Sequence, residues 1–496
     1  MDTPSSENAA PKDDKSEAPK TPPPVEIAPI VNQHQMKIGR RTLKYTTVAG
    51  RMPLKNDADE IEAQLYFTAY TLGHGEADRK RPLTIVFNGG PGSASVWLHL
   101  GALGPKRVKM QDEGWMPMPP YQLVDNEQTW LEQTDLVFVD PVGTGYSRAS
   151  KPELNKKYWN VKGDLESVGE FIRLYLTRYN RWTSPLFLAG ESYGTTRAAG
   201  LAGHLIDKGI AFNGIILIST ILNFQTDGFD RGNDLPYALF LPTYTASAWY
   251  HKMLPAALQR QPLREVLGEA ELFAETEYTT ALMKGDRLSG EEKQLVIDRL
   301  AHLTGLTPIF IDQSNLRINI HRFCKELLRD QRRTVGRLDS RFTGLDALAV
   351  TEVPEFDPSF SAITPPYTAM MTDYAHNELG FETDLTYETL SFKVNEGWEW
   401  DRGKYADTSE ALRSALAKNP FMKVFVAMGY YDLATPHFAA QYTLSHMDID
   451  PSLRGNIHIA DYEAGHMLYL DLVSLAKLQT DVQAFIKMAL TEQVVK

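Results

Sequence analysis

Cysteine is almost missing from this chain of 496 residues, which holds only one, Cys324. A single cysteine excludes an intramolecular disulfide and metal sites built on paired thiolates, and we expect Cys324 to be a buried, inert thiol. Because no run of 18 apolar residues occurs, no membrane-spanning helix is predicted. Basic residues number 51 against 63 acidic ones, and the formal net charge of −12 disfavours nucleic acid and anionic membranes as partners.

The first 36 residues are rich in Pro, Lys, Ser, Asp and Glu, which predicts a disordered tail. They contain no apolar segment of the signal-peptide type, so no secretory signal is visible. We therefore expect the chain as written to stay in the cytoplasm. If a signal sequence or a lipid anchor has been removed ahead of this tail, we expect a periplasmic or secreted protein instead.

The rest of the chain has the composition of a soluble globular protein, with 43% hydrophobic and 10% aromatic residues. Residues 42–48 and 61–70 alternate sufficiently to predict half-exposed strands at an antiparallel sheet edge. Short apolar runs then alternate with helical stretches, which predicts a doubly wound, mostly parallel α/β sheet. These runs are residues 83–87, 135–139, 186–189 and 214–219.

The pattern changes between about residues 226 and 368, where charged, helical segments dominate. Examples are residues 289–303 and 321–333, and Ser289 and Glu292 have the spacing of a helix capping box. We expect this part to be a helical cap inserted over the functional site. The expected units are a tail at 1–36, a core in two parts at 37–225 and 369–496, and the cap insertion at 226–368.

The most informative motif is Gly-Glu-Ser-Tyr-Gly at residues 190–194, which lies between an apolar run and a helical stretch. A serine with a glycine two positions away on each side, between a strand and a helix, is typical of the nucleophile elbow of an α/β-hydrolase. The turn is so tight that larger side chains at the two glycine positions would collide. Ser192 is therefore the predicted nucleophile.

A second glycine-rich segment supports this interpretation, because residues 83–87 run straight into Asn-Gly-Gly-Pro-Gly-Ser at 88–93. An α/β-hydrolase stabilises its oxyanion with two backbone N–H groups. One comes from the residue after the nucleophile and one from a glycine-rich loop after an earlier strand. We expect these to be the amides of Tyr193 and Gly90. The alternative for 88–93 is an ordinary Gly/Pro turn.

The acid and the histidine of a catalytic triad follow the nucleophile in this fold, in that order. Residues 424–428 predict a strand, Asp432 follows it directly, and His466 lies beyond a further strand in a glycine-containing loop. His437 is a rival base, but it is too close to Asp432 for a strand to intervene. The alternative role for Asp432 is a helix N-cap.

Several motifs in one order along the chain resemble those of the serine carboxypeptidase family, the carboxypeptidase Y and cathepsin A group. They are residues 88–92 (Asn-Gly-Gly-Pro-Gly), 104–105 (Gly-Pro), 140–147 (Asp-Pro-Val-Gly-Thr-Gly-Tyr-Ser), 190–194, 429–432 (Gly-Tyr-Tyr-Asp) and 464–467 (Ala-Gly-His-Met). The resemblance spans most of residues 80–470, with a divergent middle. Because eukaryotic members are typically disulfide-bonded, the chain looks like a bacterial-type member.

The resemblance implies hydrolysis of C-terminal residues of peptides through an acyl-enzyme on Ser192, with His466 as base and Asp432 as its orienting acid. Such a reaction needs no metal and no organic cofactor. The expected partner is a peptide substrate, and no motif reports on the oligomeric state or on the preferred side chains.

Recognition of the substrate's C-terminal carboxylate is only partly matched. In the family it uses the Asn of Asn-Gly-Gly, a Trp two residues earlier, a Glu three residues before the Pro of Gly-Pro, and the Glu before the nucleophile. Asn88 and Glu191 match, whereas Val86 and Ala102 stand at the Trp and first Glu positions. Two groups near in sequence that could supply a positive charge are His99 and Arg197, although Arg197 also fits an ordinary helix-surface arginine.

Three functions therefore stay open. The first is a serine carboxypeptidase, and the second is an esterase or acyltransferase that uses the same triad. A cation or a donor near Asn88 and Glu191 favours the first, and an apolar wall there favours the second. The third, a binding protein with a dead site, is disfavoured because every triad and oxyanion position is filled.

Overall fold

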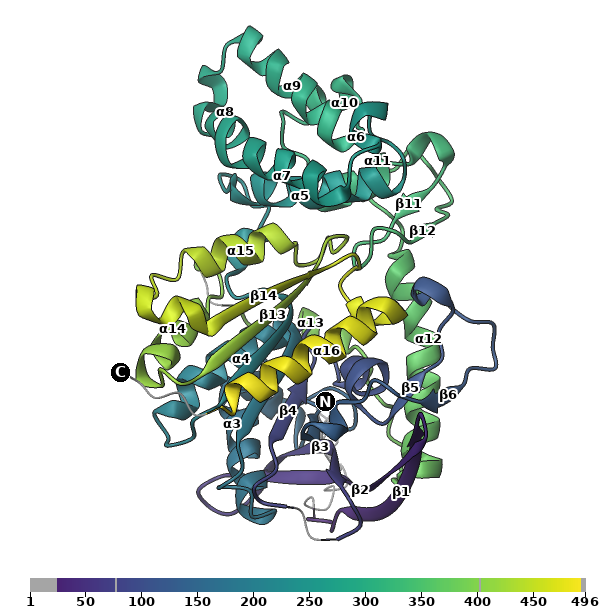
Figure 1. The fold of residues 1–496 in the computed structure, drawn as a ribbon, viewed down its shortest axis with the longest axis vertical. Helices are drawn as coiled ribbons and strands as arrows, with labels where there is room; N and C mark the ends of the chain where they lie inside the picture. Colours follow the sequence, from purple (N-terminus) through teal and green to yellow (C-terminus); the bar gives the residue numbers. More distant parts are fainter. Residues whose placement is uncertain (1–24, 76–77, 401–402, 492–496) are drawn as a thin grey trace, which may run out of the picture.

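One twisted sheet forms the centre of the computed structural model, which describes residues 25–75, 78–400 and 403–491 (Figure 1). In sheet order its strands are β1 (Ile30–Ile38), β2 (Arg41–Lys55), β3 (Ile61–Leu72), β7 (Asp135–Val139), β4 (Leu83–Phe87), β9 (Leu186–Ser192), β10 (Gly214–Thr220), β13 (Lys423–Gly429) and β14 (Ile457–Tyr462), and β8 (Arg148–Ala149) pairs with β3.

The sheet is parallel from β7 to β14 and antiparallel at the other end, where β1, β2 and β3 pair with one another and β3 pairs with β7. The parallel strands β4, β7, β10 and β13 are buried along their whole length, which explains why they are continuous apolar runs rather than alternating ones. The predicted doubly wound, mostly parallel α/β-hydrolase sheet is confirmed, and so is its antiparallel edge.

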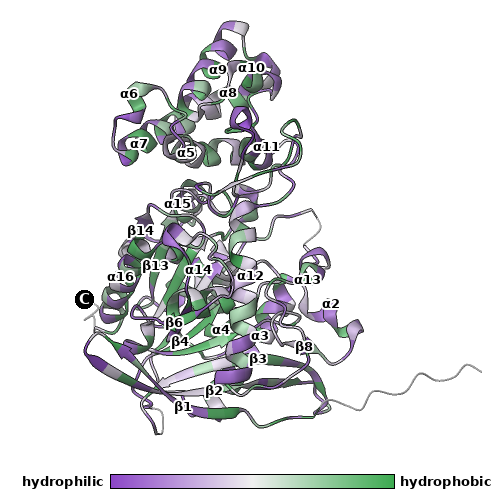
Figure 2. Ribbon diagram, turned by 90° about the vertical axis from the view of Figure 1, so that its right-hand side faces the viewer, coloured by the Kyte–Doolittle hydropathy of each residue, from purple (hydrophilic) through white to green (hydrophobic). Residues whose placement is uncertain are grey.

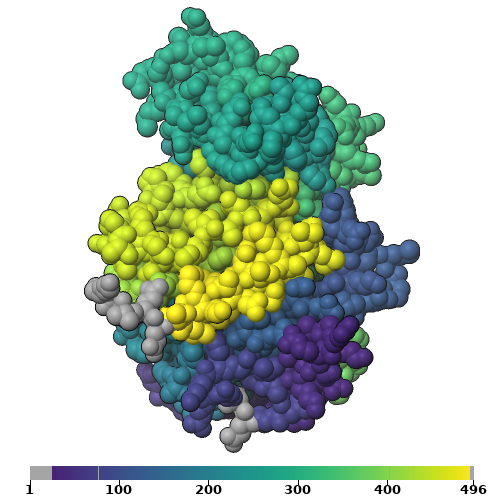
Figure 3. Space-filling view, viewed as in Figure 1, coloured from purple at the N-terminus to yellow at the C-terminus, as the bar shows by residue number. Residues whose placement is uncertain are grey.

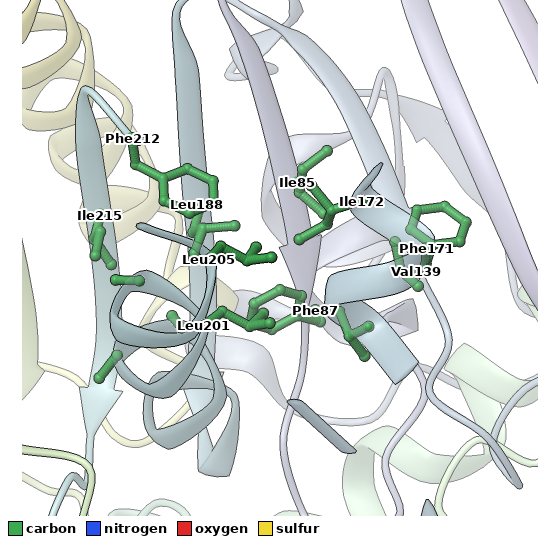
Figure 4. Packing of buried hydrophobic residues seen from close by; sticks show 14 of the residues in the cluster. Ile85, Phe87, Val139, Phe171, Ile172, Leu188, Leu201, Leu205, Phe212 and Ile215 are labelled. Carbon is green, nitrogen blue, oxygen red and sulfur yellow. The ribbon is translucent and has the colours of Figure 1, made fainter. Parts of the chain in front are cut away.

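Helices cover both faces of this sheet. On one face lie α3 (Val161–Arg178), α4 (Tyr193–Ile206) and α14 (Ser409–Lys418), and on the other lie α12 (Pro358–Asp373) and α16 (Leu472–Ala489). Figure 4 shows side chains of α3 and α4, among them Phe171 and Leu201, packed against Ile85 and Leu188 of the strands. The hydrophobic colouring of the central strands in Figure 2 agrees with this sandwiched position.

The first strand corrects the predicted tail of residues 1–36. β1 begins at Ile30, pairs with β2 from end to end, and buries Met36. The hydrophobic pattern of these residues in the sequence is weak, because β1 is an outer strand with mostly polar side chains and one fully buried residue. Its composition therefore resembles that of a linker. Residues 1–24 of the predicted tail lie outside the described part of the chain.

A helical lobe follows β10 and has its own buried cluster, separate from the two clusters on the sheet faces. Its main helices are α5 (Leu235–Tyr250), α7 (Leu263–Phe273), α9 (Gly290–Thr304), α10 (Pro308–Gln313) and α11 (Ile320–Glu326). Figures 1 and 3 show this lobe above the C-terminal part of the core, over α15 (His437–Ser445). It falls in the range where the sequence predicts a cap insertion, whose boundaries remain a prediction.

Two local predictions in this lobe have different outcomes. The capping box at the start of α9 is confirmed: the Ser289 side chain accepts from the Glu292 N–H, and the Glu292 side chain accepts from the Ser289 N–H. The helix predicted for residues 321–333 is too long, because α11 ends at Glu326 and Arg332 has a left-handed φ of 55°. Across the described ranges, no helix is both long and apolar enough to cross a lipid bilayer.

We predict that Met36→Ala lowers the free energy of unfolding by about 2–5 kcal/mol, because it removes a buried side chain between β1 and the core. The midpoint of thermal unfolding should fall by several degrees. Gln35→Ala, which changes an exposed neighbour on the same strand, should leave the midpoint unchanged. Equal midpoints for the two variants would mean that β1 does not belong to the folded core.

Candidate active site

The backbone around Ser192 forms a sharp turn between the end of β9 and the start of α4. Ser192 has φ 60° and ψ −132°, a conformation that L residues rarely adopt and that is strained for a residue with a Cβ. A Cβ added to Gly190 would lie 2.1 Å from the carbonyl oxygen of Gly194, so a side chain cannot fit there. The strand, the turn and the helix predicted for residues 185–206 are therefore all present.

The predicted acid and base come together at the same edge of the sheet. Asp432 follows β13 and His466 follows β14, and these two neighbouring strands are parallel, so their carboxyl ends lie side by side. Asp432 Oδ2 lies 2.8 Å from His466 Nδ1. Ser192 and His466 line one cavity of about 350 Å³, although Ser192 Oγ forms no hydrogen bond within the described residues. Such catalytic bonds are often loose before substrate binds.

The carboxylate of Asp432 is fully buried and held by several donors. One oxygen accepts from the N–H groups of Ala434 (2.8 Å) and Thr435 (3.0 Å), and the other accepts from the Thr435 hydroxyl (2.7 Å). Burial alone would lower the pKa of His466, but the Asp432 carboxylate outweighs it and raises the pKa above the usual value. The pair thus stabilises an imidazolium, as a general base requires.

The rival His437 takes no part in this arrangement. It is buried at the start of α15, with Nε2 3.4 Å from the Glu271 carboxylate in the helical lobe. It does not line the cavity that holds Ser192 and His466.

The two predicted oxyanion donors lie in segments that touch through their backbones. A Cβ added to Gly89 would lie 2.4 Å from the Tyr193 nitrogen, so the loop after β4 rests directly on the elbow. Gly90 borders the cavity, and its N–H has no acceptor among the described residues. Tyr193 is the first residue of α4, where a backbone N–H has no intrahelical acceptor. Both amides are therefore available to a substrate oxygen.

Arg197 is not the helix-surface arginine considered above, because it is buried to 1% exposure. Its guanidinium donates to the carbonyl oxygen of Asn88 (2.6 Å) and to the carboxylate of Asp164 (2.8 Å). It also lies over the rings of Phe87 and Tyr193. Arg197 therefore joins the glycine-rich loop, the elbow and α3, and it does not line the cavity.

The other proposed cation, His99, is wrong as a positive partner. Burial lowers the pKa of His99 to about 3, so the ring is neutral at physiological pH. Its Nε2 lies 2.6 Å from the hydroxyl of Tyr70, and its ring stacks on Phe138. These contacts belong to the core behind the site.

Glu191 and Asn88, the two residues matched to carboxylate recognition, contact each other and line the cavity with Ser192. The Asn88 amide donates to Glu191 Oε1 at 3.0 Å, and its own oxygen accepts from the Leu98 N–H at 3.0 Å. Glu191 Oε2 is buried, and no described residue bonds to it. Burial raises the pKa of Glu191 to about 7, against the opposing effect of His466.

Sequence reasoning missed two aromatic residues beside Glu191. The hydroxyl of Tyr469 is buried without a hydrogen-bond partner among the described residues, and its pKa is raised by burial and by Glu191. Burial and the same carboxyl group also raise the pKa of Tyr367. Both tyrosines pack against Gly101, next to the Ala102 that replaces the family's first glutamate. Tyrosine hydroxyls thus stand near the place where a second carboxyl group was expected.

The segment around residues 336–341 contacts both catalytic loops through its backbone. His466 donates its N–H to the Leu338 carbonyl (2.6 Å), Leu433 donates to the Arg337 carbonyl (3.0 Å), and Ser340 donates to the Tyr431 carbonyl (3.0 Å). The structure gives this segment a supporting role for Asp432 and His466.

These features define the class of the protein: an α/β-hydrolase with the site of a serine hydrolase. No three His, Cys, Asp or Glu side chains in the described ranges are placed to hold a metal ion. The model of the family described as "Serine carboxypeptidase" matches residues 41–454. The chain therefore belongs to the serine carboxypeptidase family.

Individual relatives align with smaller parts of this chain. Pheromone-processing carboxypeptidase KEX1 of Saccharomyces cerevisiae is 33% identical over 156 residues, which cover 29% of this chain and 20% of that protein. Probable serine carboxypeptidase CPVL of Dictyostelium discoideum is 25% identical over 265 residues, 49% of this chain and 48% of that one. These alignments thus span between a fifth and half of the relatives' lengths.

The fold itself is shared over a longer range. The crystal structure of the KEX1 carboxypeptidase from Saccharomyces cerevisiae superposes with a TM-score of 0.56, covering 89% of this chain and 91% of that one at 16% identity.

We predict that Arg197→Lys lowers kcat for a neutral ester roughly 10- to 100-fold with little change in KM, and that it lowers the free energy of unfolding by about 1–3 kcal/mol because the buried Asn88 carbonyl loses its donor. Lysine keeps the charge beside Asp164, but its single ammonium cannot reproduce the fork that also reaches the Asn88 carbonyl. Arg173→Lys, at an exposed arginine of α3 paired with Glu170, is the matched control and should leave kcat unchanged. A folded Arg197→Lys variant with normal kcat would show that this contact does not position the oxyanion loop.

Proposed function

We propose that the protein is a serine carboxypeptidase that removes C-terminal residues from peptides. The observation that carries the proposal is Glu191: a buried carboxyl group in the Ser192 cavity, with one oxygen bonded to Asn88 and the Tyr469 hydroxyl beside it. Its pKa of about 7 makes it a hydrogen-bond donor at neutral and acidic pH. A free carboxylate at the end of a peptide is the acceptor that such a donor fits.

The chemistry follows from the other groups of the cavity. His466, oriented by Asp432, takes the proton of Ser192 Oγ as that oxygen attacks the peptide carbonyl. The amides of Gly90 and Tyr193 stabilise the negative charge that forms on the carbonyl oxygen. His466 then gives its proton to the leaving amino group, which departs as the C-terminal amino acid, and water hydrolyses the ester on Ser192.

An esterase or acyltransferase with the same triad is the second candidate. It is favoured by the apolar part of the cavity wall, which Trp97, Phe360, Ile363, Leu390, Phe392 and Met467 form. It is also favoured by Val86 and Ala102 at two positions of the family's carboxylate network. The two candidates differ in whether Glu191 takes part in substrate binding, and the pH dependence described below separates them.

We predict that Ser192→Ala and Asp432→Asn both abolish most turnover. Loss of the nucleophile should lower kcat by about 10⁴- to 10⁶-fold, and the asparagine should favour the wrong tautomer of His466 and lower kcat by about 10⁴-fold. A fluorophosphonate probe should label the wild-type protein on Ser192, as read by peptide mass spectrometry. Labelling that survives in Ser192→Ala, or near-normal activity of Asp432→Asn, would contradict these assignments.

We predict a distinct pH dependence for substrates with a free carboxylate. The quantity to measure is kcat/KM for a blocked dipeptide acid divided by kcat/KM for a matched neutral ester, because the shared requirement for neutral His466 cancels in this ratio. Below pH 7 Glu191 is protonated and donates to the carboxylate; above it Glu191 ionises and repels the carboxylate. The ratio should therefore fall by about tenfold for each pH unit above 7.

Glu191→Gln keeps a donor that cannot ionise, so its ratio should stay flat with pH. Glu463→Gln removes an exposed carboxylate close to His466 and serves as the control, which should keep the wild-type profile. If wild type and Glu191→Gln give the same flat ratio, Glu191 is not a carboxylate receptor, and the esterase candidate gains.

A further inference from the structure

Arg337 is a cation on the wall of the cavity that contains Ser192, and it forms no ion pair with any residue that the structure describes. It lines the same cavity as Ser192, Glu191 and His466, and it is partly exposed. Of the described residues that line this cavity, it is the only arginine or lysine. Its backbone is fixed, because its N–H donates to Asp357 (3.2 Å) and its carbonyl accepts from Leu433 (3.0 Å). Its guanidinium bonds to no carboxylate within the described ranges.

The other arginines close to the catalytic loops are paired. Arg197 bonds to Asp164. Arg341 donates to the Asp339 carboxylate through Nε (3.0 Å) and through one terminal nitrogen (2.7 Å). A buried or half-buried arginine is normally matched in this way, since its charge loses hydration without gaining a partner otherwise. The unmatched charge of Arg337 is therefore the exception in this part of the molecule.

The anionic groups around Arg337 do not neutralise it. Asp357 lines the same cavity, but its carboxylate caps α12 and accepts from the N–H groups of Arg337, Leu338 and Ser359 and from the Ser359 hydroxyl. Asp227, the other nearby acid, has its pKa raised to about 7 by burial, so it is partly protonated at neutral pH. The charge of Arg337 also makes a lowering contribution to the pKa values of His466, of His321 and of the buried Cys324 thiol. None of these three groups carries a negative charge that could pair with Arg337.

We propose that Arg337 binds a carboxylate of the substrate, at a position separate from the one that Glu191 faces. A guanidinium presents a fork of donors that matches a carboxylate, and it does so best where water is partly excluded, as on this wall. The inference rests on the proposed peptidase function and deepens it. It makes Arg337 a specificity-determining residue of the cavity.

The carboxylate that fits this position is an acidic side chain next to the scissile bond, because the proposed function gives the C-terminal carboxylate to Glu191 and Asn88. Arg337 and Glu191 line the same cavity, and no hydrogen bond or ion pair joins them within the described residues. A substrate with both an acidic side chain and a free C-terminus can occupy both. The experiment therefore varies each carboxylate independently.

The test compares wild type with Arg337→Gln, Arg337→Lys and Arg333→Gln. Arg333 is exposed on the same segment and does not line the cavity, so it controls for the loss of one positive charge. The substrates are blocked dipeptides with Glu or Gln on either side of the scissile bond, each as the free acid and as the C-terminal amide. A neutral ester reports on the triad and on folding, and kcat/KM is measured for each at its pH maximum.

The expected result is that Arg337→Gln lowers kcat/KM roughly 10- to 100-fold for substrates that carry the recognised carboxylate, and changes the neutral ester by less than about threefold. Arg337→Lys should recover part of the loss, and Arg333→Gln should behave as wild type. A loss confined to the Glu-containing peptides supports the inference, whereas a loss confined to free acids would mean that Arg337 binds the C-terminal carboxylate and would overturn the separate position.

An equal loss for acidic, neutral and amidated substrates, or no loss for any of them, would overturn the inference. Failure of the proposed function looks different, because wild type would then hydrolyse the ester but none of the peptides. If Arg337→Gln fails to hydrolyse even the ester, the comparison uses Arg337→Lys instead. That variant should then discriminate less than wild type between Glu and Gln substrates.

Discussion

Direct contact between two stretches of backbone is the constraint on which the rest of this site depends. The loop after β4 and the elbow after β9 come from neighbouring parallel strands, and they approach so closely that Gly89 has no room for a Cβ beside the Tyr193 nitrogen. Gly194 is restricted in the same way by the Phe87 carbonyl. This contact puts the Gly90 amide next to the cavity and fixes the strained turn that presents Ser192. Arg197, bonded to the Asn88 carbonyl, holds the two stretches together from behind.

Buried charges organise the surroundings of this contact. The pairs Arg197 with Asp164 and His466 with Asp432 are both satisfied, and each links segments that form the candidate site. Two groups on the cavity wall have no ion pair or hydrogen bond of ordinary geometry within the described residues: the buried Oε2 of Glu191 and the partly exposed guanidinium of Arg337. A buried polar atom without such a bond is costly, and it is common where a ligand supplies the partner. The unmatched groups therefore face the space that the substrate would occupy.

Most of the fold could be predicted from the sequence because its parallel strands are continuous apolar runs, and because glycine-rich loops follow them where the backbone must approach closely. Asp432 could be placed because it follows the buried apolar strand β13, and His466 because it lies beyond the next strand in a glycine-containing loop. β1 could not be predicted, since polar residues occupy both of its faces and only one methionine is fully buried, so its alternating exposure has no matching alternation of hydrophobic residues. The roles of Arg197, Tyr469 and Arg337 also could not be predicted, because the groups that surround each of them come from segments distant in the sequence, and no motif encodes those contacts.

The central claim is that Ser192, the two amides and Glu191 act on one bound peptide. A crystal structure of the protein with a peptidyl phosphonate that ends in a free carboxylate tests it most directly. The account predicts phosphorus bonded to Ser192 Oγ, a phosphonate oxygen about 3 Å from the nitrogens of both Gly90 and Tyr193, and the terminal carboxylate beside Glu191 and Asn88. Phosphorus on another side chain, or a phosphonate oxygen that points away from both amides, would contradict it.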